Sequence, residues 1–160
     1  METLIRNASA SDLDALLRLE ETCFSLPWTR AQLKGEMPDE RHEFLVAEGR
    51  NGEIVGYIGM MTVLDEGYIS NVAVAPAVRR CGIGRTLVRE MLRRAAERDL
   101  SFVTLEVRQH NDAAIALYAG EGFEPVGRRK GYYERPKEDA LLMTRFFRQK
   151  DEDHHENTWL

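Results

Sequence analysis

The sequence predicts an α/β (α+β) fold, a single domain in which helices flank a mixed central β-sheet. The chain of 160 residues has the usual length of one domain. Its hydrophobic content of 43% is enough for a core, and segments with strand and helix periodicity alternate along it. We expect the domain to cover residues 1–148 and residues 149–160 to form a polar, disordered C-terminal tail.

The first half is expected to contain a strand, two helices and a three-stranded antiparallel meander. Ser9, with Asp12 three positions later, is typical of a helix start, and apolar residues at helical spacing follow. Thr29 can cap a second, short helix. The expected strands of this half cover residues 4–6, 44–47, 54–64 and 68–74. The pair Asn51-Gly52 between two of them is a strong hairpin signal.

The second half is expected to alternate between strands and helices. Pro76 ends the meander, and a basic loop leads into a long amphipathic helix over residues 83–95. The remaining predicted elements are strands over residues 102–107, 123–126 and 140–147 and a helix over residues 111–118. A strand–helix–strand crossover after residue 74 makes the expected sheet mixed.

Composition and charge exclude several classes of protein. With 22 basic and 27 acidic residues, the net charge of −5 argues against a general nucleic-acid binder, which needs a basic surface. The two cysteines, Cys23 and Cys81, fit a reducing compartment rather than a disulfide scaffold. No secretory signal begins the chain, and its longest uncharged stretch is far below the roughly 18 residues of a membrane span. We expect a cytoplasmic protein with no nucleic-acid or membrane partner.

No metal site is expected. The four histidines and two cysteines have no zinc-like spacing, and the pair His154-His155 lies in the charged tail. The basic cluster Arg128-Arg129-Lys130 is expected to be a solvated turn; the alternative is contact with acidic groups of the ligand or partner.

The most informative segment is the loop that opens the long helix. The strand end and loop together contain Val72, Ala73, Val74, Arg79, Arg80, Cys81, Gly82, Ile83, Gly84 and Arg85. Free N–H groups at a helix N-terminus suit a phosphate, and the two glycines let an anion approach them. The segment is neither a P-loop nor a dinucleotide fingerprint, because the Lys-Ser/Thr ending and the third glycine are missing. It indicates a different phosphate-bearing ligand; the alternative is a tight turn with solvated arginines.

Several motifs resemble a known family. Arg79-x-x-Gly82-x-Gly84 after an apolar strand is similar to the acyl-coenzyme-A signature of the GCN5-related N-acetyltransferases (GNAT), whose order of elements resembles residues 4–147. Other segments are similar to the bacterial ribosomal-protein-alanine N-acetyltransferases. These segments are FSLPW at 24–28, LEVR at 105–108, Asn111-x-x-Ala114-x-x-Leu117-Tyr118, Gly122-Phe123, Tyr132-Tyr133 and Glu138-Asp139-Ala140. Each is weak alone, but together and in this order they are specific.

The resemblance implies acetyl-coenzyme A (acetyl-CoA) as cosubstrate and no metal. It implies that the backbone of residues 72–74 pairs with the pantetheine arm, that residues 80–85 hold the pyrophosphate, with Arg79 also in the cosubstrate-binding set, and that Asn111 hydrogen-bonds the cosubstrate. Cys81 departs from the long polar side chain expected at its position. If its thiol is exposed, binding becomes sensitive to oxidation.

Acetyl transfer from a thioester to an amine needs a base, an oxyanion donor and an acid. Glu106 is the candidate base. Strand alternation places it on one face with Arg108, and the pattern alone favours a surface ion pair between these two. Tyr118 is the candidate acid, because a phenol with a reference pKa of about 10 is neutral at pH 7; a core aromatic is the alternative. The resemblance supports both catalytic roles and implies the Val74 N–H as oxyanion donor.

The resemblance implies that the acceptor is the N-terminal alanine of a protein, a small-subunit ribosomal protein. An α-amine, with a reference pKa of about 7.7–8.0 against about 10.4 for lysine, is more readily deprotonated. Trp28, Tyr132 and Tyr133 are the expected acceptor-binding residues, with residues 24–28 and Glu138 as further walls. Two alternatives stay open: an acetyltransferase for a small-molecule amine such as a polyamine or aminoglycoside, and a non-catalytic coenzyme-A-binding regulatory module.

Overall fold

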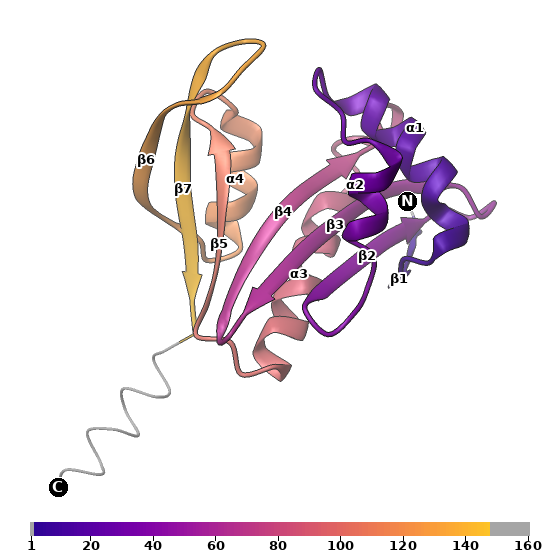
Figure 1. Ribbon diagram of the computed structural model, residues 1–160, viewed down its shortest axis with the longest axis horizontal. Coiled ribbons are helices and arrows are strands. Elements are labelled where there is room, and N and C mark those ends of the chain that lie inside the picture. Colours follow the sequence, from indigo (N-terminus) through magenta and orange to yellow (C-terminus); the bar gives the residue numbers. More distant parts are fainter. Residues whose placement is uncertain (1, 148–160) are drawn as a thin grey trace, which may run out of the picture.

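The computed structural model describes residues 2–147 (Figure 1). The predicted tail at residues 149–160 lies outside this range. The elements in chain order are β1 (Leu4–Asn7), the short 3-10 helix η1 (Ala10–Asp12), α1 (Leu13–Cys23), α2 (Arg30–Gly35), β2 (His42–Glu48), β3 (Ile54–Val63), β4 (Glu66–Val74), the 3-10 helix η2 (Pro76–Val78), α3 (Ile83–Glu97), β5 (Phe102–Arg108), α4 (Asp112–Gly120), β6 (Glu124–Tyr133) and β7 (Glu138–Phe146). None of the helices in this range has the length and apolar character needed to cross a membrane.

The strands form one seven-stranded sheet in the order β1-β2-β3-β4-β5-β7-β6. All neighbours are antiparallel except β4 and β5, which are parallel and joined by α3. The predicted mixed sheet and crossover are therefore confirmed. The predicted hairpin between β2 and β3 is also present, with Gly52 at a φ of +84° in the left-handed region that glycine adopts without strain.

Helices cover both faces of the N-terminal part of the sheet. Phe44 and Val46 of β2 pack with α1 and α2, whereas Leu45 and Ala47 pack into the larger core with α3. Burial on both faces explains the continuous apolar run in this strand. Figure 1 shows α3 and α4 behind the sheet and α1 and α2 in front of it, while no described helix covers the front of β5, β7 and β6.

The predicted helix starts are confirmed. The Ser9 backbone N–H donates to the Asp12 carboxylate at 2.9 Å, and the Arg6 guanidinium binds the same carboxylate with two hydrogen bonds of 2.8 and 2.9 Å. At α2, the Gln32 N–H donates to the Thr29 hydroxyl at 3.2 Å and the Thr29 N–H donates to the Gln32 side chain at 2.9 Å. This reciprocal pair satisfies N–H groups that the helix itself cannot. It also fixes the loop before α2, which borders the site described below.

One predicted strand boundary is wrong. The expected strand over residues 123–126 continues as β6 to Tyr133, so the basic cluster Arg128-Arg129-Lys130 lies in a strand rather than in a turn. β6 is an edge strand that is exposed along most of its length, and its register with β7 shifts twice. An exposed, bulged strand has no apolar alternation for the sequence to show.

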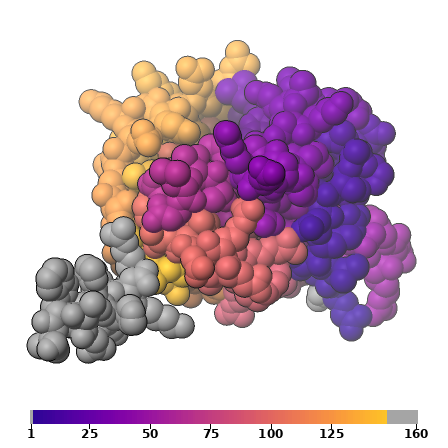
Figure 2. Space-filling model, turned by 60° about the horizontal axis from the view of Figure 1, so that its bottom comes forward, coloured from indigo at the N-terminus to yellow at the C-terminus, as the bar shows by residue number. Residues whose placement is uncertain are grey.

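β4 and β5 pair only at one end. Their ladder joins residues 66–68 to residues 102–104 and stops there, although both strands continue. The register of β4 against β3 shifts near Ser70, and such a bulge bends a strand. Figure 1 shows the two strands diverging beyond the paired end. Figure 2, which looks onto this end, shows the β6–β7 hairpin and the N-terminal elements on opposite sides of the molecule.

Candidate active site

A cleft of about 1550 Å³ occupies the gap between the diverging strands. It is lined by β4 and β5, by the beginnings of α3 and α4, and by the α1–α2 and β6–β7 loops. The volume exceeds the range of about 300–1,000 Å³ typical of a site for one small ligand. The cleft therefore has room for two reactants side by side.

The N-terminus of α3 opens into this cleft without a side-chain cap. Gly82 precedes the helix at a φ of +82°, so its carbonyl and the following N–H groups turn sharply into the helix. At Gly84 a Cβ would lie 3.6 Å from Leu117 and 3.7 Å from Val74, where α3, α4 and β4 meet. The uncapped N–H groups of the first helical turn form an anion-binding position, and the cleft lining includes Arg79, Arg80 and Arg85 beside it.

The edge of β4 presents backbone groups to the cleft. The Ala75 N–H donates to the Val55 carbonyl at 2.8 Å. Because hydrogen-bonded pairs alternate in an antiparallel ladder, Val74 and Val72 direct their N–H and C=O groups away from β3. Arg79 Nε donates to the Val74 carbonyl at 3.1 Å. The Val74 N–H thus points into the cleft as a potential donor, as the predicted oxyanion role requires.

Two residues predicted with this segment lie elsewhere. Ala73 is buried beneath α1 and α2 and does not line the cleft. Cys81 is an exposed free thiol whose Sγ lies 3.8 Å from the Arg79 carbonyl, also outside the lining. Their side chains therefore contribute nothing to the cleft wall. The predicted Asn111 does line it, and its Oδ1 accepts a hydrogen bond from the Ala114 N–H at 3.2 Å as the cap of α4.

Glu106 lies in the cleft on the face of β5 predicted from strand alternation. Val103, Leu105 and Val107 point the other way into the main core. The expected pair with Arg108 is wrong: Arg129 Nε donates to Glu106 Oε1 at 3.2 Å, whereas Arg108 pairs with Glu138. Arg129 reaches Glu106 from the edge strand across β7, a contact that depends on the register of β6. The pair leaves the Glu106 side chain 27% exposed, so its carboxylate is accessible to a ligand.

Tyr118 lies on α4 against Phe123, with ring centroids 5.7 Å apart, and is almost fully buried. Burial raises the pKa of its phenol to about 12. Within residues 2–147 the hydroxyl has no hydrogen-bond partner, yet no side-chain oxygen in this range is both sealed from solvent and unpaired. The hydroxyl therefore opens onto the cleft, which Tyr118 lines. It is a protonated group that can donate to a ligand there.

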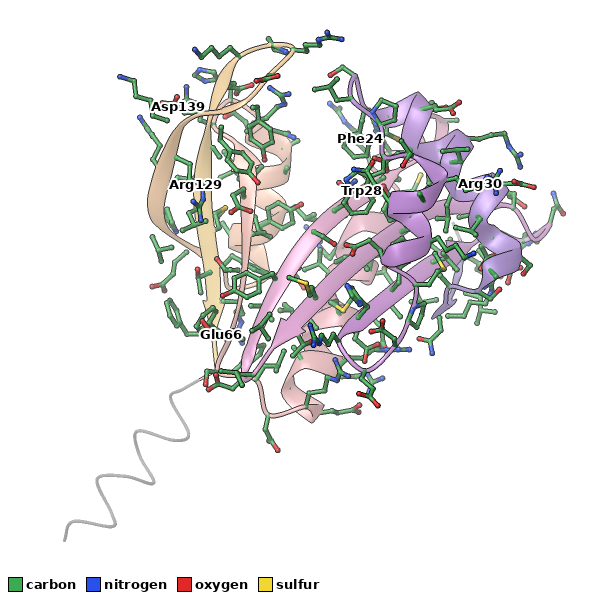
Figure 3. The ribbon with its side chains drawn as sticks, in the orientation of Figure 1. Phe24, Trp28, Arg30, Glu66, Arg129 and Asp139 are labelled. Carbon is green, nitrogen blue, oxygen red and sulfur yellow. The ribbon has the colours of Figure 1, made fainter. Side chains whose placement is uncertain are left out.

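Two loops frame the cleft at the end away from the paired residues of β4 and β5 (Figure 1). Figure 3 shows Phe24 and Trp28 on the α1–α2 side, across the opening from β6, which carries Arg129. The Ser25 hydroxyl donates to the Arg135 carbonyl at 2.8 Å and so bridges the two loops. The predicted acceptor-binding residues Trp28, Tyr132 and Tyr133 all belong to the lining.

Arg108 holds the β6–β7 loop in place. Its guanidinium donates to the Pro136 carbonyl at 2.8 Å and to the Glu134 carbonyl at 3.1 Å, and it lies 4.4 Å over the Tyr133 ring. Glu138, predicted as a wall, is not in the lining. It accepts the His110 N–H at 2.9 Å and pairs with Arg108 at 3.2 Å, which lowers the pKa of its carboxyl group. Glu138 therefore supports the loop from outside the cleft.

Glu20 is a cleft residue that the sequence analysis missed. The residue is 1% exposed, and its carboxylate accepts hydrogen bonds from the Trp28 N–H at 2.9 Å, from the Asn71 amide at 3.3 Å and from the Tyr57 hydroxyl. Burial raises the pKa of this carboxyl group. Asn71 in turn accepts the Val72 N–H at 3.1 Å, so Glu20 links the α1–α2 loop to the edge of β4. The sequence does carry a signal for this residue, because Glu20 is a carboxylate on the apolar face of the predicted first helix.

The arrangement supplies the three groups that acyl transfer to an amine requires. A carboxylate, a protonated phenol and a free backbone N–H border one cleft, and an anion-binding helix N-terminus lies at its end. Over the described range, no three His, Cys, Asp or Glu side chains are grouped so as to hold a metal ion.

Comparisons with known proteins agree with this geometry. The model of the Acetyltransferase (GNAT) family matches residues 13–123. A Bacillus subtilis relative is 34% identical over 139 residues, which cover 87% of this chain and 92% of that protein. The ribosomal protein bS18-alanine N-acetyltransferase of Escherichia coli K12 is 31% identical over 141 residues, with 87% and 94% covered. The crystal structure of the Escherichia coli ribosomal-protein-S18-alanine N-acetyltransferase superposes with a TM-score of 0.84 over 91% of this chain and 94% of that chain, at 31% identity. This chain belongs to the GNAT family of acetyltransferases.

Proposed function

We propose that this protein transfers the acetyl group of acetyl-CoA to the α-amine of the N-terminal alanine of a ribosomal protein of the small subunit. The observation that carries the proposal is one cleft that contains Glu106, Tyr118 and the uncapped start of α3. The relatives that cover most of this chain are ribosomal protein bS18-alanine N-acetyltransferases, which supports the choice of acceptor. The free thiols of Cys23 and Cys81 fit a cytoplasmic site of action.

The part of the cleft at α3 and β4 fits acetyl-CoA. The N–H groups of the first turn of α3, with the arginines beside them, would bind the pyrophosphate. The carbonyl groups of Val72 and Val74, which point away from β3, would accept hydrogen bonds from the amides of the pantetheine arm, the Val74 carbonyl alongside Arg79. Gly84 has no side chain to fill the junction of α3, α4 and β4, so the diphosphate can approach the helix. Bound in this way, acetyl-CoA supplies the activated acetyl group.

The remaining residues would carry the proton transfers. Glu106 would accept a proton from the acceptor amine, directly or through water. The Val74 N–H would stabilise the negative charge that develops on the carbonyl oxygen. Tyr118 would donate its phenolic proton to the departing thiolate. Its raised pKa of about 12 keeps this proton available across the physiological range.

The charges of the cleft favour a protein N-terminus over a polyamine. Three carboxylates belong to the lining, Glu20, Glu106 and Glu134. Glu20 already accepts three hydrogen bonds, and Glu106 is paired with Arg129. A polycation therefore finds no cluster of free carboxylates in this lining. The aromatic loops instead suit a neutral peptide backbone with one terminal amine.

An acetylation assay with mass spectrometry tests the proposal. The protein and acetyl-CoA are incubated in three separate reactions. The acceptors are a peptide that begins with alanine, the same peptide with a blocked N-terminus, and spermidine. We expect the added mass on the alanine α-nitrogen of the free peptide and none on the blocked one. Acetylation of spermidine alone, or of lysine side chains alone, would contradict the proposed acceptor. Binding of coenzyme A without any transfer would indicate a regulatory module.

A further inference from the structure

A second, smaller groove of about 290 Å³ lies on the front face of the sheet, which no described helix covers. Two rows of side chains, one from β5 and one from β7, form the groove. The strand register places Phe102 opposite Phe146 and Glu106 opposite Leu142. Residues at even spacing along a strand share one face. The groove therefore runs along β5 and β7 from Glu106 at one end to Phe146 at the other.

The floor of this groove is apolar and offers no free polar group. The two buried hydroxyls between the rows, those of Thr104 and Thr144, hydrogen-bond to each other at 2.8 Å, and Thr104 also donates to the Met143 carbonyl at 3.1 Å. At the far end the Phe102 and Phe146 rings lie 6.1 Å apart, and Phe146 is 42% exposed. A volume of this size suits one or two apolar side chains rather than a whole small-molecule ligand.

The groove adjoins the active-site cleft at Glu106, which lines both. Two other directions away from Glu106 are closed. The Ser25–Arg135 hydrogen bond bridges the loops on one side, and the pairing of β4 with β5 closes the opposite end of the gap. The rear of the cleft is the position proposed for acetyl-CoA. A chain whose first nitrogen reaches Glu106 therefore leaves the cleft across the front face.

We propose that this groove binds the acceptor polypeptide downstream of its first residue and selects an apolar or aromatic side chain among residues 2–4. The inference rests on the proposed acetylation of a protein N-terminus. From Glu106 to Phe102 the strand advances by about 13 Å, at roughly 3.3 Å per residue. An extended acceptor covers that length with its first few residues, and alternate side chains face the groove. Arg129, at the Glu106 end, also disfavours a basic side chain beside it.

Two acceptor peptides and matched variants test this inference. Both peptides begin with alanine; one has phenylalanine or leucine at positions 2–4, and the other has serine there. The variants are Phe146→Asp and the milder Phe146→Ser at the end of the groove. The control is Val126→Asp, which changes an exposed apolar residue of β6 that lines neither cavity. The affinity for coenzyme A, measured by calorimetry, checks that each variant is folded.

We expect the wild-type protein to have a kcat/KM about tenfold or more higher for the apolar peptide, because burying one large apolar side chain gives at least this ratio. Phe146→Asp should remove most of this preference and Phe146→Ser part of it, with the serine peptide unaffected. Val126→Asp should keep the full preference. The proposed role of the groove would be contradicted by equal kcat/KM values for the two peptides in the wild-type protein. An unchanged preference in both Phe146 variants would contradict it as well. Acetylation of neither peptide would instead refute the proposed function.

Discussion

Glu106 and Arg129 form an ion pair across β7, with Arg129 Nε 3.2 Å from Glu106 Oε1. The proposed base is thus held by a residue of the edge strand, two strands away in the sheet. A guanidinium in this position keeps the carboxylate oriented in the absence of substrate. The arriving amine must then share the carboxylate with Arg129 or replace it.

Glu106→Gln should lower kcat by a factor of about 10²–10⁴, because the amide keeps the shape of the side chain but cannot accept the proton. Binding of acetyl-CoA should be unchanged, since the α3 N-terminus is not altered. Steady-state kinetics and calorimetry measure the two effects. Glu134→Gln, which changes another carboxylate of the cleft lining, is the matched control and should stay near wild type. Unchanged turnover in Glu106→Gln would remove this residue from the mechanism.

Tyr118→Phe should slow the chemical step and leave the free energy of unfolding within about 0.5 kcal/mol, because the lost hydroxyl has no partner among the described residues. The raised pKa of about 12 gives a second prediction for the wild-type protein. The phenol stays protonated well above neutral pH, so kcat should not fall through loss of this proton below about pH 10. Single-turnover rates measured against pH check both points. A wild-type rate in Tyr118→Phe would rule out the role of acid.

Gly84→Val should weaken acetyl-CoA binding about tenfold or more. The Cβ of the new side chain would make ordinary contacts of 3.6 and 3.7 Å with Leu117 and Val74, and its two methyl groups would extend beyond them toward the position proposed for the diphosphate. Displacing the diphosphate from one charge-assisted hydrogen bond costs roughly 1.5–3 kcal/mol. Calorimetry with coenzyme A measures the change. Gly35→Val, at a position where a Cβ meets no atom within 4 Å, should bind normally; equal affinities for the two variants would contradict the assignment.

Glu20→Gln should change how stability depends on pH. Burial raises the pKa of Glu20 in the folded state, so its contribution to stability is fully present below the unfolded pKa of about 4.3 and is lost as pH rises through the folded pKa. The glutamine variant lacks this titration. The stability of the wild type relative to the variant should therefore be greater at about pH 5 than at about pH 8. Urea unfolding of both proteins at the two pH values measures it, and an equal difference at both would contradict the raised pKa.

Local chemistry made much of the fold predictable. At the helix starts, the Ser9 N–H donates to the Asp12 carboxylate and the Thr29 hydroxyl accepts from the Gln32 N–H, so each start depends on a residue only three positions away. The same holds for α3, where the apolar stripe defines the helix and Gly82 its start. Alternation along β5 also placed Glu106 on the correct face. Each of these features is determined within a few residues of chain.

Features that depend on distant strands were not predictable. The partner of Glu106 is set by the register of β6, which two shifts against β7 determine and which no periodicity reveals. The donors to Glu20 come from the α1–α2 loop, β3 and β4, brought together only by tertiary packing. The length of β6 was missed because an exposed edge strand carries polar residues on both faces. Most residues of the motifs therefore lie along one cleft, whereas the hydrogen-bond network around them required the structure.

The short ladder between β4 and β5 has a thermodynamic consequence. Three paired positions join the two strands, and beyond them the halves of the sheet are joined through the core packed against α3 and α4 rather than by strand pairing. A cosubstrate bound along β4 would contact both halves. It would bind the folded state and not the unfolded chain. By mass action, the melting temperature should then climb with the logarithm of acetyl-CoA concentration once the site is saturated.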